Sequence, residues 1–234
     1  MITRRLLADP EHGPLPGMLL VLTVLTGVID AVSILRLGRV FVANMTGNIV
    51  FVGFALAGAP GFVLTASLFA LAGFLVGAAL GGAMAGRLGH DRAILVRAGT
   101  LVELALISSA LAVSAVAGPH FGRGVTDALA AVSAVAMGVQ NAVVRRLAVA
   151  DLTTTVLTMT LTGIAADVRS GHRGWTLVRR VLAVGAMLLG AVAGAELVLH
   201  VGATAGFGLA VALVATVAAG ALSTARRPAA WRAG

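Results

Sequence analysis

Two carboxylates interrupt long apolar stretches of this sequence and are the first candidates for chemistry. Asp30 lies five residues before the end of one apolar run, and Glu103 lies about ten residues inside another. An ionisable group inside a membrane span usually faces a cavity or a partner and belongs to a proton or ion pathway. We therefore expect Asp30 to bind a proton or cation. The alternative interpretation is an ion pair near the helix end with Arg36 or Arg39.

Asparagine and threonine side chains form a second candidate set. The motif Asn44-Met45-Thr46-Gly47-Asn48 breaks one apolar stretch, and six threonines lie between positions 153 and 162. Such side chains satisfy free backbone groups where a helix is broken, and a half-helix N-terminus attracts negative charge. A single threonine can instead bond to its own helix. We expect a binding site for a small polar or anionic solute, or an ion, with these candidates: Asp30, Asn44, Thr46, Asn48, Gln140, Asn141, Thr155, Thr158 and Glu103.

Side chains for other chemistry are scarce. The sequence has no cysteine, its five histidines are scattered, and no nucleophile, base and orienting group converge. We therefore expect no metal, no cofactor and no enzymatic activity. Three functions remain: a small secondary transporter with a proton as candidate coupling ion, a non-transport membrane protein for assembly or sensing, and a passive channel.

The composition is that of a membrane protein. Of the 234 residues, 59% are hydrophobic and 11% are charged, whereas a soluble domain has about 25% charged residues. The net charge of +8, carried by seventeen arginines, would suggest nucleic acid in a soluble protein. In a membrane protein the same charge marks topology. We expect the lipid bilayer of a bacterial inner membrane as the environment, and no nucleic-acid partner.

Eight apolar segments are separated by short polar breaks. Six of them have about 20 or more residues, the length that crosses a hydrocarbon core of about 30 Å. The stretches 40–58 and 152–166 are interrupted by polar residues or too short, so we predict broken or re-entrant half-helices there. The fold class is therefore an all-α polytopic membrane protein. The eight segments are 15–35, 40–58, 62–86, 93–117, 124–144, 152–166, 180–200 and 205–224.

The chain carries an internal repetition. Gly27-Val28-Ile29-Asp30-Ala31-Val32 and Gly138-Val139-Gln140-Asn141-Ala142-Val143 agree at four of six positions, and an Arg-Leu pair follows each. We predict one membrane domain over 1–234, with repeat 1 at 15–117 and repeat 2 at 124–224. In this scheme Asn141 is the uncharged counterpart of Asp30.

The arginines distinguish two topologies. If the two broken segments enter and leave on one side, the seventeen arginines divide fourteen to three, whereas eight full spans divide them ten to seven. Cytoplasmic loops carry the excess of arginine, so the first division is favoured. It predicts six transmembrane helices in two inverted repeats, with tails 1–14 and 225–234 in the cytoplasm. The alternative is eight spans in two parallel repeats.

Glycines at every fourth position form two packing ridges. Such ridges let helix backbones approach closely. They could join the two repeats to each other or join two protomers, so a homo-oligomer is a candidate assembly. The glycines are Gly73, Gly77, Gly81, Gly190 and Gly194.

Two motifs together resemble a known family. The first is Gly27-x-x-Asp30-Ala31-Val32-Ser33 followed by Phe41-Val42-Ala43-Asn44-Met45-Thr46-Gly47-Asn48. The second is Gly138-x-Gln140-Asn141-Ala142 followed by Asp151-Leu152-Thr153-Thr154-Thr155-Val156-Leu157-Thr158. In this order, and over nearly the whole chain, they resemble the YoaK-type family of bacterial membrane proteins of unknown function. The resemblance implies an integral inner-membrane protein and no particular substrate. Met159 departs from it, because a glycine equivalent to Gly47 is expected there.

Overall fold

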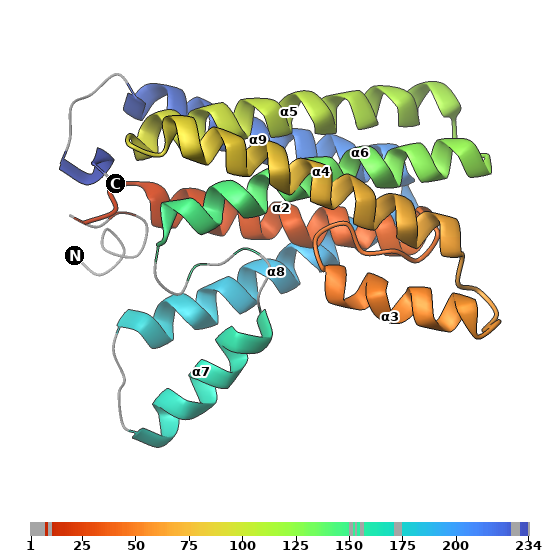
Figure 1. The fold of residues 1–234 in the computed structure, drawn as a ribbon, viewed down its shortest axis with the longest axis horizontal. Coiled ribbons are helices and arrows are strands. Elements are labelled where there is room, and N and C mark those ends of the chain that lie inside the picture. The colour runs from red at the N-terminus through yellow and green to blue at the C-terminus, as the bar shows by residue number, and fades with distance from the viewer. Residues whose placement is uncertain are drawn as a thin grey trace.

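The computed structural model describes residues 8, 11–149, 152, 154, 157–170, 175–225 and 230–233. Helices dominate this part of the chain, which contains no β-strand. Figure 1 shows most of the helices side by side in one bundle. The elements are α2 (Leu15–Arg36), α3 (Met45–Leu56), α4 (Leu64–Leu88), α5 (Arg92–Ala117), α6 (Arg123–Leu147), α7 (Leu157–Ser170), α8 (Trp175–His200), α9 (Ala203–Ala225) and the short 3-10 helix η1 (Ala230–Arg232).

Within the described residues, six helices are long and apolar enough to cross a membrane, namely α2, α4, α5, α6, α8 and α9. The other two are short, with 12 residues in α3 and 14 in α7. At 1.5 Å per residue each covers about 20 Å, less than a hydrocarbon core of about 30 Å. The predicted all-α polytopic fold is therefore confirmed, with six candidate spans and two short helices among the described residues.

The two short helices begin later than their apolar segments do. The stretch 40–58 becomes helical only at Met45, and in the stretch 152–166 the described residues Leu152 and Thr154 are not helical, whereas α7 runs from Leu157. Asn44 stands directly before α3, and three threonines at 153–155 stand before α7; such residues favour caps and turns over helix interiors. Figure 1 shows α3 and α7 starting near the middle of the bundle's length and running toward opposite ends. Each short helix thus reaches only one end of the bundle.

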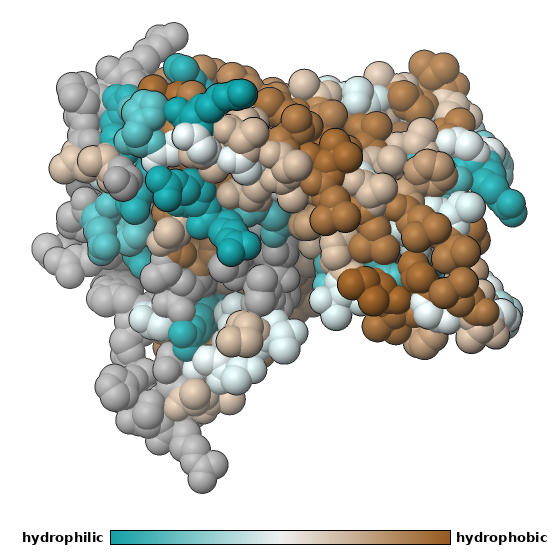
Figure 2. Space-filling view, viewed as in Figure 1, coloured by the Kyte–Doolittle hydropathy of each residue, from teal (hydrophilic) through white to brown (hydrophobic). Residues whose placement is uncertain are grey.

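The helices α2 and α6 are the most buried of the six spans. They form the centre of the bundle, while α4 and α8 expose most of their side chains at the periphery. Figure 2 shows apolar surface over much of the visible face, with hydrophilic groups gathered mainly at one end. Polar side chains on α2 and α6 are therefore shielded from lipid, where an unsatisfied polar group would cost several kcal/mol (about 4–8 by transfer to hydrocarbon).

The first glycine ridge joins α4 to α6. A Cβ atom on Gly77 would lie 2.0 Å from the Val135 carbonyl oxygen, and Gly73 and Gly81 lie against the backbone of the same helix. Only a glycine leaves room for this approach, because the obstacle is backbone rather than a flexible side chain.

The second ridge joins α8 to α2 in the same way. A Cβ atom on Gly190 would lie 2.0 Å from the Val24 carbonyl oxygen, and Gly194 packs against Val28. The ridges were predicted to join either the two repeats or two protomers. In this structure they form contacts between the two halves of one chain. The third helix of each half lies on the first helix of the other half.

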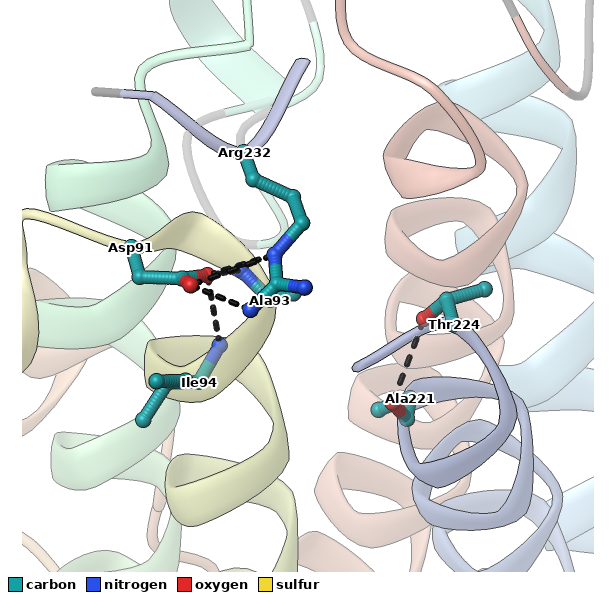
Figure 3. Close-up of polar contacts among 6 residues, drawn as sticks. All are labelled: Asp91, Ala93, Ile94, Ala221, Thr224 and Arg232. Carbon is teal, nitrogen blue, oxygen red and sulfur yellow. Dashed lines mark hydrogen bonds and ion pairs between the residues drawn. The ribbon is translucent and has the colours of Figure 1, made fainter. Parts of the chain in front are cut away.

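An ion pair fastens the C-terminal segment to the turn between α4 and α5. Figure 3 shows the Arg232 guanidinium on the Asp91 carboxylate, with 3.1 Å between Arg232 Nε and Asp91 Oδ2. The same carboxylate caps α5, because Asp91 Oδ1 accepts hydrogen bonds from Ala93 N at 2.9 Å and Ile94 N at 3.1 Å. An isolated antiparallel bridge between Asp91 and Ala233 completes the contact. We call this contact the C-terminal latch.

The latch predicts a pH-dependent stability. The hydrogen bond from Arg232, together with the N–H groups of Ile94 and Ala93, lowers the pKa of Asp91 below its ordinary value of about 3.9. The ionised carboxylate stabilises the folded state, so this contribution is complete above about pH 4 and is lost as pH falls through the lowered pKa. Asp91→Asn should therefore lower the unfolding temperature at pH 7, and the difference from wild type should vanish in acid.

Thermal unfolding in detergent between pH 3 and pH 8 measures this difference. An N-cap is worth about 1 kcal/mol. Asparagine keeps a good cap while it removes the ion pair, and Asp91→Ala removes both, so the two variants together separate the two contributions. An Asp91→Asn deficit that persists unchanged at low pH would rule out the ionised carboxylate as its cause.

Candidate functional site

A cavity of about 810 Å³ lies where the two short helices meet the two central ones. Its walls come from α2, from the loop before α3, from the first two turns of α3, from the start of α7, and from single residues of α4, α6 and α8. Five of the nine predicted site residues contribute to it, and they come from both halves of the chain. The polar lining consists of Thr26, Asp30, Asn44, Thr46, Asn141 and Thr158.

Asp30 is buried at the wall of this cavity, with 7% of its surface exposed. Its carboxylate faces the backbone N–H groups of Val42 and Ala43, and its Oδ1 atom has no hydrogen-bond partner among the described residues. The alternative of an ion pair does not hold there, because Arg36 donates to the Pro119 carbonyl oxygen at 3.2 Å. Arg39 lies against Gly61 instead. The carboxylate is therefore a buried acceptor facing open space.

The start of α3 is held in place by Asn48, which lies outside the cavity. Its Oδ1 accepts a hydrogen bond from Phe41 N at 2.8 Å, and its Nδ2 donates to the Phe41 carbonyl oxygen. Both polar ends of this side chain are thereby occupied by one residue of the preceding loop. Asn48 positions the loop that faces Asp30, and it is not placed to bind a solute.

Gly47 and the ring of Phe41 fix the same corner. A Cβ atom on Gly47 would lie 2.5 Å from the Phe41 ring, so only glycine allows the ring to pack there. The equivalent position on α7 is Met159, whose side chain is exposed. The departure from the family pattern therefore marks a real difference between the starts of the two short helices.

The N-terminus of α3 carries no side-chain cap. Asn44 precedes the helix without a capping hydrogen bond, and Asn44 and Thr46 are exposed to the cavity. The first N–H groups of a helix have no partner inside the helix and form the positive end of its dipole. An uncapped N-terminus at a cavity is therefore a place where an anion or a polar oxygen can bind.

Thr158 brings the start of α7 to the same cavity. The Thr158 carbonyl oxygen accepts a hydrogen bond from Thr162 Oγ1 at 2.9 Å. Thr162 thus bonds to its own helix, which is the alternative role considered for a single threonine. Thr155, the remaining threonine candidate, lies outside the described residues.

Asn141 lies between two cavities. Its Nδ2 donates to the Met137 carbonyl oxygen of its own helix at 2.9 Å. It lines the central cavity and also a second cavity of about 830 Å³, and Phe74 of α4 is the other residue that both share. The second cavity continues to Arg145 and Arg146 at the end of α6. Asn141 and Phe74 thus form the wall between two spaces.

Gln140 and Glu103 lie apart from the central cavity. Both are buried, and both line a small void between α2, α5 and α6. One contact connects this pair to the cavity, because Gln140 Nε2 donates to Thr26 Oγ1 at 3.0 Å. Both residues were predicted as members of one site. They form instead a second polar centre, which Thr26 connects to the central cavity.

Thr26, Phe74 and Met187 were not singled out in the sequence. Thr26 precedes Asp30 by four residues, so both lie on one face of α2, and this spacing was the available signal. Phe74 and Met187 belong to uniform apolar stretches, and only the packing of α4 and α8 brings them to the cavity. Among the described residues, no three His, Asp or Glu side chains gather as metal ligands.

Comparison with known proteins agrees with the family resemblance. Residues 18–220 match the family described as "Protein of unknown function (DUF1275)". The chain is also 32% identical over 151 residues to the "UPF0700 transmembrane protein YoaK" of Bacillus subtilis (strain 168). That match covers 64% of this chain and 66% of the relative, so the chain spans just under two thirds of the relative's length. No solved structure matches. The chain is therefore a multi-pass membrane protein that belongs to the DUF1275 family, whose function is unknown.

Proposed function

We propose that this protein is a secondary transporter that moves a small anionic solute together with a proton. The observation that supports the proposal is the central cavity itself. It gathers the first turns of both short helices and the matched polar residues Asp30 and Asn141 of the two central helices. In many transporters the substrate binds near the bilayer midplane, at the ends of discontinuous helices from two repeats.

The proposal includes an inverted repeat. A Cβ atom on Gly27 of α2 would meet the backbone of Met187 and Ala191 on α8. A Cβ atom on Gly138 of α6 would meet the backbone of Phe74 and Ala78 on α4. In each half, the glycine of the first helix therefore packs against the backbone of the third helix of the other half. The opposite directions of α3 and α7 in Figure 1 agree with a half-turn about an axis in the membrane plane.

Two adjoining cavities support alternating access. The central cavity and the second cavity have Phe74 and Asn141 in common, and the second continues to Arg145 and Arg146. The equivalent region of the first half, between the ends of α2 and α8, holds a smaller space of about 220 Å³ that shares no lining residue with the central cavity. We assign Phe74 and Asn141 to the barrier between the site and the arginine-rich end. If the two halves exchanged these arrangements, the central cavity would open toward the opposite end of the bundle.

The charges favour an anion that travels with a proton. The uncapped N-terminus of α3 offers partial positive charge at the cavity, and Arg145 and Arg146 offer full charge at its entrance. Asp30 would repel an anion while ionised. A proton on Asp30 removes this repulsion, so binding of the anion and the proton favour each other.

Proton movement into liposomes tests the proposal directly. Purified protein is reconstituted with a pH-sensitive dye inside, and an inward gradient of succinate, phosphate, sulfate or lactate is applied. The same four probes are first ranked by the shift each gives in thermal unfolding. We expect one of them to stabilise the protein and to acidify the liposome interior. Entry of a probe without proton movement would indicate a channel, and no stabilisation and no flux with any probe would reject the proposal.

The proposal also fixes an orientation. Within the described residues, nine arginines lie toward the end of the bundle where α4, α6, α7 and η1 end and where α5 and α8 begin, and three lie toward the opposite end. The positive-inside rule assigns the richer end to the cytoplasm. The nine are Arg87, Arg92, Arg97, Arg145, Arg146, Arg169, Arg179, Arg180 and Arg232, and the three are Arg36, Arg39 and Arg123.

Single cysteines test this orientation, because the natural chain has none. Ala57 follows the end of α3 and Ala166 lies in the last turns of α7, and both are exposed. We expect a membrane-impermeant thiol reagent added to intact cells to label Ala57→Cys. Ala166→Cys should react only after the membrane is permeabilised. Labelling of both variants from the same side would contradict the inverted arrangement.

A further inference from the structure

The small void between α2, α5 and α6 contains an unsatisfied polar pair. Glu103 and Gln140 are almost completely buried, with 1% and 2% of their surfaces exposed. Glu103 Oε1 and Gln140 Oε1 both lack a hydrogen-bond partner among the described residues, and both side chains line the void. Two acceptor oxygens at one buried space require a donor, because an unpaired buried oxygen is costly.

No cationic side chain of the surroundings supplies that donor. The other residues that line the void are apolar or hydroxyl-bearing, and none is ionisable. Thr100 donates its hydroxyl hydrogen to the Val96 carbonyl oxygen at 2.8 Å. The helix α9, which packs along α5, has no ionisable residue in its sequence. The arginines of α4, α5 and α6 lie toward the helix ends, and the nearest in sequence, Arg97, does not line the void.

We propose that Glu103 binds a proton and holds a water molecule against Gln140, which makes the void a second proton site. The void of about 10 Å³ has room for one water molecule. That water accepts a hydrogen bond from the Glu103 carboxylic acid and donates one to Gln140 Oε1, so both oxygens have a partner. A neutral acid also avoids an isolated charge in a region that holds no compensating charge.

The void is connected to the central cavity by a short chain of hydrogen bonds. Gln140 Nε2 donates to Thr26 Oγ1 at 3.0 Å, and Thr26 Oγ1 donates to the Leu22 carbonyl oxygen at 2.9 Å. Thr26 lines the cavity four residues from Asp30. When Glu103 loses its proton, the negative carboxylate attracts the hydrogens of the water and weakens the hydrogen bond from the water to Gln140. The hydrogen bond from Gln140 to Thr26 then changes as well. This coupling role rests on the proposed function, whereas the proton and the water on Glu103 do not.

Infrared spectroscopy of isotope-labelled glutamate tests the proton. The chain has three glutamates, and the side chains of Glu11 and Glu196 are 83% and 66% exposed. With ¹³C-glutamate in nanodiscs at pH 7, we expect one carboxylic-acid carbonyl band, which Glu103→Gln removes. Glu196→Gln is the matched control and should keep the band. Three ionised glutamates at pH 7 would overturn the proposal.

Two further arms test the water and the alternative ligand. Gln140→Leu keeps the carboxylic acid but removes the acceptor, so the Glu103 band should move to higher frequency. A band that does not move would overturn the assignment of water between the two side chains. Loss of the band on addition of sodium chloride would indicate a cation site instead of a proton site. None of these measurements requires transport, so failure of the liposome assay and failure of this inference remain distinguishable.

Discussion

Asp30→Asn is expected to abolish solute-driven proton movement in liposomes while leaving a folded protein. The substitution keeps the shape of the side chain and removes the group that exchanges a proton. Its position on α2 is buried and faces the cavity, so no other carboxylate of the described lining can replace it. The dye signal should fall to that of protein-free liposomes. The unfolding temperature should stay within a few degrees of wild type, since an amide suits the same partners.

A matched control separates the site from the loss of a charge alone. Glu196→Gln also removes one carboxylate from a membrane helix, but its partner is the exposed His200 at 3.1 Å, near the end of α8. We expect its proton flux to equal that of wild type. Full flux in Asp30→Asn, measured beside this control in the same preparation, would exclude Asp30 as the coupling group.

Gly77→Ala is expected to disrupt folding strongly, although it adds only one methyl group. The new Cβ atom would lie 2.0 Å from the Val135 carbonyl oxygen, and the obstacle is the backbone of α6. Overpacking a well-packed core typically costs about 1–3 kcal/mol, and a backbone contact relaxes less than a side chain does. The two helices must separate, and we expect little monodisperse protein after detergent extraction.

Gly86→Ala on the same helix is the control. A Cβ atom there would meet nothing within 4 Å, and alanine favours a helix over glycine by about 1 kcal/mol. We expect this variant to match or exceed the yield and unfolding temperature of wild type. Equal behaviour of the two alanine variants would mean that α4 and α6 are not packed as closely as described. Gly190→Ala should repeat the Gly77 result at the contact between α8 and α2, where the same distance is 2.0 Å.

The helices were predictable because the physics that places them is local. Length and hydropathy are enough to identify a span. The polar breaks also predicted the two half-helices, since asparagine and threonine compete for backbone hydrogen bonds. The starting residues Met45 and Leu157 were not predictable, because they depend on how the preceding loops pack.

The roles of individual polar residues were predictable only in part. Asn44 and Asn48 are the same residue type in one short motif, yet Asn44 faces the cavity and Asn48 holds the backbone of Phe41. Only the path of the loop decides between them. Glu103 was correctly identified as an unusual buried acid, but its distance from the main cavity follows from the packing of α5. Hydropathy does not encode which face of one helix meets another.

The crossed packing of the halves has a consequence for synthesis. The helix α2 is inserted first, but it packs chiefly against α8, whose residues are made after most of the chain. Until then, the close-contact face around Gly27 has no partner from this chain, and Asp30 lacks its final surroundings. A chain that ends before α8 therefore presents an unmatched glycine face and a carboxylate to the bilayer.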